Sequence, residues 1–185
     1  MENELESLKF PIGKYKAILD FNFSRTIENI KTLESFSDDL RKSVKGLDKT
    51  DLKKSYRNGG MNIAQIIHHF CDTHTYAFLR TKHTLLEDNP NVKMYDVAEF
   101  LTTPDSNVLD VKDSLNVIEG VHAKWVSLLK TLSENDLKKT YYHSSRDKNI
   151  ILHEHVGMYA WHTKHHIMHI EIAKKNIKQS GKRNK

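Results

Sequence analysis

The sequence predicts an all-α protein, a four-helix bundle in which a long crossover connection joins two helical hairpins. Only three prolines and seven glycines interrupt the 185 residues, so the segments between them are long. Four of these segments place apolar residues at the spacing of one helix face, and none alternates as a half-buried strand does. The motif DLKK(S/T)Y follows the first and the third segment, at the same place in each half.

The first hairpin is expected to consist of two long helices. Ser24 can cap a helix over 25–45, which Gly46 then stops. Asn62 can cap a second helix that runs to about Glu87, shortly before a proline. A short polar stretch with a glycine pair separates the two helices.

The second hairpin follows a long connection over 89–108, which holds one short helix near 95–101. The third long helix is expected over 111–132 and the fourth over 152–175. Because the DLKK(S/T)Y motif recurs between the two helices of each half, we expect two similar hairpins that assemble into a bundle.

Length and charge predict one domain with a basic end. A chain of 185 residues fits a single domain, which we place at residues 1–175. Residues 171–185 hold six basic residues and one acidic residue, so they account for the whole net charge of +5. We expect residues 176–185 to form a flexible basic tail. Without a basic face on the domain itself, no nucleic-acid partner is expected.

The chain is expected to be cytoplasmic and not to enter a membrane. No apolar run approaches the roughly 18 residues that a membrane span needs. The first ten residues, MENELESLKF, lack the apolar core of a secretory signal. The single cysteine, Cys71, excludes an intrachain disulfide and is expected to pack as a small apolar side chain.

Twelve histidines indicate a metal site. His162 and His166 lie one turn apart on the fourth helix, about 6 Å along its axis, so both rings can reach one ion. A third ligand must come from another helix, where His69 is the first candidate and His68 the alternative. Three imidazoles with one open position are typical of a catalytic zinc site, and nickel or iron would also suit them.

Other chemical motifs are incomplete. The zinc-protease motif HExxH fails because Thr163 stands where its glutamate should be. A di-iron bundle needs two Glu-x-x-His pairs, and Glu119 with His122 supplies only one. Asp72 lies one turn after His68 and His69 and is the candidate catalytic residue. It would orient a ligand ring or accept a proton from metal-bound water. The alternative is that Asp72 is an exposed acidic residue of the helix without a catalytic role.

Several motifs together resemble the DinB superfamily of four-helix bundles, specifically its YfiT-like metal-dependent hydrolases. The resemblance implies one divalent metal ion per chain, zinc or nickel, held by three histidines and water. Its first ligand precedes an acid by three residues, which selects His69 before Asp72, and the other two match His162 and His166. It also implies a homodimer. The motifs are LKFPIGKY (8–15), YRNGG (56–60), IIHHFCDTH (66–74), EDNP (87–90) and YAWHTKHHIMHI (159–170).

Two residues depart from that family pattern. Met61 stands where these relatives usually carry a tryptophan, and His169 stands where the wider superfamily often has a glutamine. Neither departure removes a ligand.

Three functions are compatible with these residues. The first is a hydrolase of a small-molecule substrate, in which the metal activates a water molecule. The second is a thiol S-transferase or isomerase that uses a low-molecular-weight thiol, as other members of the superfamily do. The third is a non-catalytic bundle with a structural metal, which needs a fourth protein ligand from His155 or His169.

Overall fold

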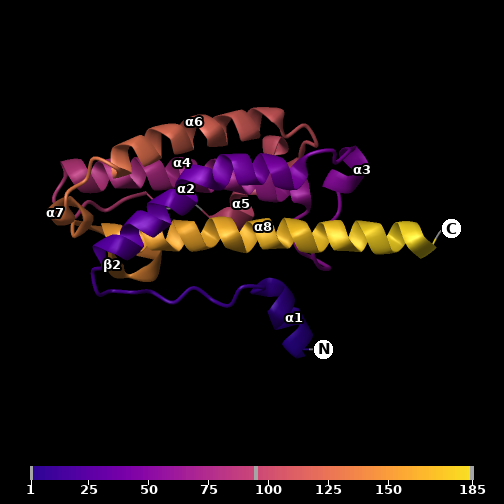
Figure 1. Ribbon diagram of the computed structural model, residues 1–185, viewed down its shortest axis with the longest axis horizontal. Helices are drawn as coiled ribbons and strands as arrows, with labels where there is room; N and C mark the ends of the chain where they lie inside the picture. The colour runs from indigo at the N-terminus through magenta and orange to yellow at the C-terminus, as the bar shows by residue number, and fades with distance from the viewer. Residues whose placement is uncertain (1, 94–95, 184–185) are drawn as a thin grey trace.

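Four long helices form the bundle that the sequence predicts (Figure 1). The structure, a computed structural model, describes residues 2–93 and 96–183. Helices α2 and α8 run in one direction, and α4 and α6 run in the other. The four helices are α2 (Phe23–Val44), α4 (Ile63–Leu86), α6 (Lys112–Leu129) and α8 (Leu152–Arg183).

Each long helix packs mainly against the two long helices of the other half of the chain. Helix α2 contacts α6 and α8, and α4 contacts the same two. The two helices of each predicted hairpin therefore lie across the bundle from each other. The connection after α4 returns along the bundle, so α6 starts at the same end as α4 (Figure 1).

Short elements fill the connections. The short helix expected near 95–101 is present as α5, and the connection also contains a 3₁₀ helix, η1. The short elements are α1 (Glu2–Lys9), α3 (Lys49–Leu52), α5 (Val97–Phe100), η1 (Pro104–Asn107), α7 (Glu134–Leu137), β1 (Thr140–His143), η2 (Ser144–Arg146) and β2 (Lys148–Ile151).

Side-chain caps decide where the helices start. The prediction of Asn62 as the cap of α4 is confirmed: its Oδ1 accepts the backbone N–H of Gln65 at 2.8 Å. The predicted cap of α2 was wrong by two residues. Asn22, rather than Ser24, accepts the backbone N–H of Arg25, at 2.9 Å, so the helix begins at Phe23.

A small hairpin was not expected from the sequence. Strands β1 and β2 pair antiparallel and place Tyr141 opposite Ile150, both fully buried. Asp147 in the turn has a φ of +46°, a left-handed conformation that aspartate tolerates. The expectation that the chain contains no strand was therefore wrong at this hairpin, although the bundle itself is confirmed. Helix α1 was also not predicted.

Two apolar clusters fill the bundle, one toward each end, and a layer of histidines separates them. One cluster contains Phe36, Leu40, Ile66, Phe70, Ile118 and Ile170. The other contains Ile30, Leu33, Ala77, Trp125, Val156 and Tyr159.

Helix α8 continues through Arg183, beyond the predicted end of the domain. The side chains of residues 178–185 lie outside the described part of the chain, so the flexible basic tail over 176–185 stays a prediction. Among the described helices, none is both long enough and apolar enough to cross a membrane.

Candidate metal centre

Three histidines from two helices meet in the layer between the apolar clusters. His69 comes from α4, and His162 and His166 come from α8, one turn apart. One ring nitrogen of each lies within 4.8 Å of those of the other two. The Nε2 atoms of His69 and His162 are 3.1 Å apart. The structure therefore brings together the three residues that were expected to bind a metal.

A chain of hydrogen bonds fixes the orientation of His162. Its Nδ1 lies 3.1 Å from Nε2 of His74, whose Nδ1 lies 2.7 Å from Nε2 of His122. The chain ends where Nδ1 of His122 meets the backbone carbonyl of Leu33, at 2.8 Å.

The carbonyl at the end of this chain determines which ring nitrogen of each histidine carries the proton. Burial holds the pKa of His122 at about 4 and lowers the pKa values of His74 and His162 well below the ordinary range, so all three rings are neutral at pH 7. A carbonyl only accepts, so His122 donates from Nδ1 to Leu33. Its Nε2 then accepts from His74, and His74 accepts from Nδ1 of His162. The lone pair of His162 is thereby left on Nε2, facing His69.

A shorter chain does the same for His166. Nε2 of His169 donates to the carbonyl of Leu8 at 3.1 Å, so its Nδ1 accepts from Nδ1 of His166 at 3.2 Å. The lone pair of His166 is again left on Nε2. The His169 ring also stacks on Tyr56, with ring centroids 3.8 Å apart.

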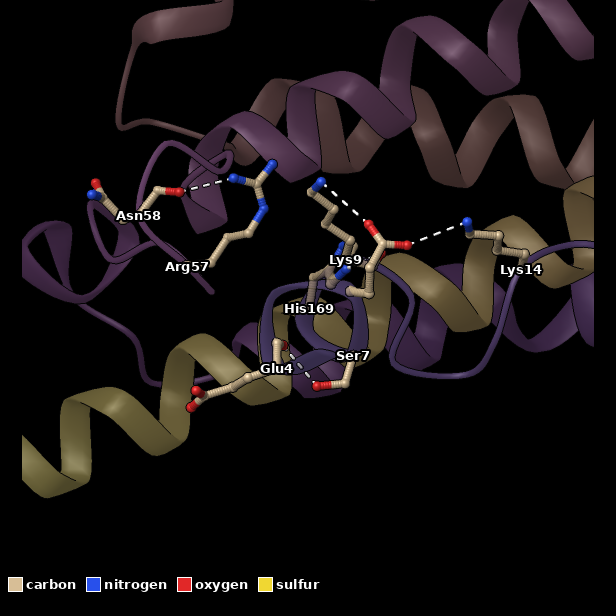
Figure 2. A network of polar contacts seen from close by, with 8 residues as sticks. Glu4, Ser7, Lys9, Lys14, Arg57, Asn58 and His169 are labelled. Carbon is tan, nitrogen blue, oxygen red and sulfur yellow. Dashed lines mark hydrogen bonds and ion pairs between the residues drawn. The ribbon is translucent and has the colours of Figure 1, made fainter. Parts of the chain in front are cut away.

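The acceptor of this second chain lies at the end of helix α1. Figure 2 shows His169 next to Lys9, whose carbonyl is 3.3 Å from Nε2 of His169. Glu6 forms ion pairs with Lys9 and Lys14, at 3.3 and 3.2 Å, which tie α1 to the segment that follows it. Helix α1 thus holds the carbonyl that orients His169.

Among the three candidate ligands, His69 has a hydrogen-bond partner that allows either tautomer. The Thr73 hydroxyl, one turn along α4, lies 3.2 Å from Nδ1 of His69. A hydroxyl can donate or accept, so Nε2 of His69 can carry a proton or a lone pair. Burial lowers the pKa of His69 to about 4, which keeps the ring neutral.

This set of donors fits a divalent metal ion. One ring nitrogen each of His69, His162 and His166 lies within 4.8 Å of the other two, and the hydrogen-bond chains leave the lone pairs of His162 and His166 on Nε2. Converging lone pairs repel one another unless a proton or a cation lies between them. Neutral imidazoles oriented by a second hydrogen bond are the usual ligands of zinc and nickel.

A cavity of about 420 Å³ opens beside two of the three histidines. His69 and His162 form part of its wall, so a small molecule in the cavity can reach them. The remaining lining residues come from α4, α5, the hairpin and α8, and are Thr73, Arg80, Val97, His143, Ser145, Arg146, Met158 and Tyr159.

Two other sequence candidates point elsewhere. His68 bonds through Nδ1 to Ser114, at 2.8 Å, and through Nε2 to the carbonyl of Val108, at 3.0 Å, so it does not join the cluster. Burial, followed by the charge of Asp105, raises the pKa of the Asp72 carboxyl, and His68 opposes this shift. The groups that act on Asp72 thus lie on the His68 side of α4, and its catalytic role stays a prediction.

The two histidines considered as a fourth ligand are already bonded. His155 contacts the Tyr141 hydroxyl through Nδ1, at 2.9 Å, and the Ala77 carbonyl through Nε2, at 3.2 Å. Both ring nitrogens of His169 are used in the chain from His166. His165, His166 and His169 also lie close enough to hold an ion, but the bonds of His169 leave it no free lone pair.

The family model of the DinB superfamily matches residues 32–170, which include the whole three-histidine cluster. The chain belongs to the DinB superfamily. Its relatives within this superfamily match over nearly their whole length. A protein of Oceanobacillus iheyensis is 38% identical, and the match covers 88% of this chain and 93% of that protein. A protein of Geobacillus kaustophilus is 34% identical, and the match covers 92% of this chain and 96% of that protein. Both carry the name "Putative metal-dependent hydrolase".

A solved relative has the same fold. The structure of YfiT from Bacillus subtilis superimposes with a TM-score of 0.88 at 32% identity, covering 91% of this chain and 97% of YfiT. YfiT is described as "a probable metal-dependent hydrolase with an unusual four-helix bundle topology". The predicted resemblance is confirmed.

Within this DinB-superfamily bundle, several site residues were not predicted. His74 and His122 were visible as histidines, but their spacing to His162 follows no motif. Arg80, His143 and Arg146 line the cavity from two distant segments. Only the fold brings these residues together, so no local sequence signal marks them.

Proposed function

We propose that this chain is a metal-dependent hydrolase in which one divalent ion, zinc or nickel, binds Nε2 of His69, His162 and His166. The observation that supports this proposal most directly is the pair of hydrogen-bond chains that end on backbone carbonyls. These chains leave the Nε2 lone pairs of His162 and His166 free to bind a metal. The names of the relatives, which describe metal-dependent hydrolases, agree with this assignment. The homodimer that the resemblance implies is part of the same proposal.

The residues have separate roles in this proposal. A divalent ion in such a site supplies Lewis acidity, which polarises a substrate carbonyl and lowers the pKa of a water molecule to about 7. His74 and His169 hold the ligand rings in the binding tautomer. The cavity beside His69 and His162 admits a small-molecule substrate, and the Thr73 hydroxyl lies in its wall.

A purely structural metal is less consistent with the geometry. A structural zinc site is closed by four protein ligands. The two residues considered for the fourth place, His155 and His169, use both ring nitrogens in other hydrogen bonds. Three ligands beside a cavity leave a position open for substrate or water.

Metal counting tests the binding part of the proposal. Elemental analysis of the purified, metal-loaded protein should give about one ion per chain. His162→Ala and His166→Ala should lose it while the helical circular dichroism is kept. His83→Ala is the matched control, because His83 lies on the exposed surface of α4, where it pairs with Glu87 and lies apart from the three-histidine cluster. Equal metal content in all four proteins would refute the site.

Activity assays separate hydrolysis from thiol transfer. The loaded protein should cleave ester or amide substrates without an added thiol, and the stripped protein should not. Turnover only in the presence of a low-molecular-weight thiol would instead identify the transferase alternative.

A further inference from the structure

The cavity beside the proposed metal centre is lined by a buried arginine that forms no ion pair with an acidic side chain of the described residues. Arg80 is only 5% exposed. Its guanidinium donates to the Tyr159 hydroxyl, at 3.2 Å, and to the carbonyl of Lys93, at 3.4 Å, while Nε has no partner among the described atoms. No described ion pair includes Arg80. The guanidinium carbon also lies over the Tyr76 ring, 5.5 Å from its centroid. This cation–π contact offsets part of the cost of burying a charge, and a bound anion would offset more.

A second arginine and a buried histidine lie on the same cavity. Arg146, in the hairpin turn, donates to the sulfur of Met158 at 3.4 Å, and sulfur is a weak acceptor. His143 is 6% exposed, and its Nδ1 has no partner among the described atoms. Burial and then the charges of Arg146 and Arg80 lower the pKa of His143 to about 4. Both guanidinium groups are therefore close enough to His143 to repel a proton on its ring.

The described lining of the cavity contains no aspartate or glutamate. His69 and His162, two of the proposed metal ligands, form one part of the cavity wall. Arg80 and Arg146 form another part, and both are positively charged. Val97 and Met158 add apolar surface. A volume of about 420 Å³ suits a small molecule.

We propose that Arg80 and Arg146 bind an oxyanion group of the substrate, a carboxylate or a phosphate, beside the metal centre. A guanidinium group matches both oxyanions through paired N–H donors. The substrate then carries its anion on the arginines and its reactive bond toward His69 and His162. This inference rests on the proposed function for the position of the reactive bond, but not for the binding of the anion.

The test uses calorimetric titration of the full chain after its metal has been removed, so that no anion can bind through an ion. The probes are succinate and inorganic phosphate, with uncharged succinamide as the neutral analogue. The wild-type protein should bind at least one oxyanion at millimolar concentration and not succinamide. Tighter binding of succinate would indicate a carboxylate substrate, and tighter binding of phosphate a phosphorylated one.

Matched variants assign the binding to the two arginines. Arg146→Gln, in an exposed turn where folding is not at risk, should weaken binding by about tenfold or more. Arg80→Gln should weaken it further, and Arg80→Lys should restore part of the loss. Arg41→Gln is the control, since Arg41 pairs with Glu119 at 2.7 Å on the bundle surface.

Two results would overturn the anion site: no binding of either oxyanion, or binding of equal strength in the wild type, Arg146→Gln and Arg80→Gln. Metal counting on the same proteins keeps the two proposals apart. Both arginine variants should retain wild-type metal content. A chain that binds oxyanions through the arginines but no metal would support the anion site while refuting the hydrolase.

Discussion

At the residue scale, the centre depends on how a neutral imidazole divides its two nitrogens between one N–H and one lone pair. His162 and His166 each give their N–H to another histidine, and each chain ends on a backbone carbonyl. The fold therefore selects the tautomer that can bind a metal before any metal arrives. Such outer partners commonly change metal affinity by about 10–100-fold.

Replacing His74 by phenylalanine tests the first chain. His74→Phe removes the acceptor of the His162 N–H but keeps a ring among the neighbouring aromatic side chains. We expect metal affinity, measured by competition with a chelator, to fall by about tenfold or more. Nitrogen-15 spectra of the metal-free variant should show His162 as a mixture of tautomers, whereas the wild type should show a single Nδ1–H form.

His83→Ala again serves as the control and should match the wild type in both measurements. Unchanged affinity together with unchanged tautomers in His74→Phe would show that the chain does not orient His162.

Sequence reasoning reached the three histidines that the structure brings together, but not the residues that orient them. The four-residue spacing of His162 and His166 follows from helix geometry, and the DinB resemblance chose His69 over His68. The acceptors that orient the rings are the carbonyls of Leu33 and Leu8. Every residue has a carbonyl, so no side-chain pattern can mark these two.

At the element scale, helix α4 positions most of the site. It carries His69, then Thr73 and His74 about one turn later, and Arg80 nearer its end. Asn62 starts this helix through a reciprocal pair of hydrogen bonds with Gln65, at 2.8 and 3.0 Å. The start of α4 should therefore affect stability without changing the metal ligands.

The capping residue gives a direct test of this expectation. Asn62→Ala should lower the free energy of unfolding by about 1 kcal/mol, measured by urea denaturation, because the N–H of Gln65 loses its acceptor. Asn62→Asp, which keeps an acceptor oxygen, should stay within a few tenths of the wild type. Metal content should be the same in all three proteins, and equal loss of stability in both variants would contradict the role of the cap.

The elements that sequence reasoning missed are the short ones. Strands β1 and β2 have four residues each, too few to show a periodic pattern beside a strongly polar loop. Their place is set by Tyr141 and Ile150, which become buried only when the hairpin packs on the bundle. The long helices were predicted because each repeats its apolar face over several turns.

At the scale of the whole molecule, buried histidines make stability depend on pH. Burial, with a further contribution from Arg80, lowers the pKa of His155 to about 3, and burial lowers that of His122 to about 4. Both return to about 6.5 in the unfolded chain. Well above pH 6.5 neither state binds these protons. As the pH falls from about 6.5 to about 4, the unfolded chain binds protons that the folded chain excludes.

The metal-free protein should therefore lose stability over that pH range. Urea denaturation at successive pH values between 7 and about 4.5 should show a steadily falling free energy of unfolding. A free energy that stays constant down to pH 5 would contradict the neutral, buried state of these rings.

Which helices pack against one another could not be predicted from local sequence patterns either. The repeated DLKK(S/T)Y motif suggested two similar halves, and the structure packs each helix mainly against the other half. This arrangement brings α4 beside α8, which places His69 against His162 and His166. The cavity with Arg80 and Arg146 arises in the same way, from segments that are distant in the chain.

The central claim is that one ion binds His69, His162 and His166 through Nε2. X-ray diffraction from a crystal of the metal-loaded protein, collected at the absorption edge of the bound metal, tests this most directly. We predict one anomalous peak per chain, about 2.0–2.1 Å from the three Nε2 atoms if the metal is zinc. A peak held by His165 and His169, or no peak beside His69, would contradict the account.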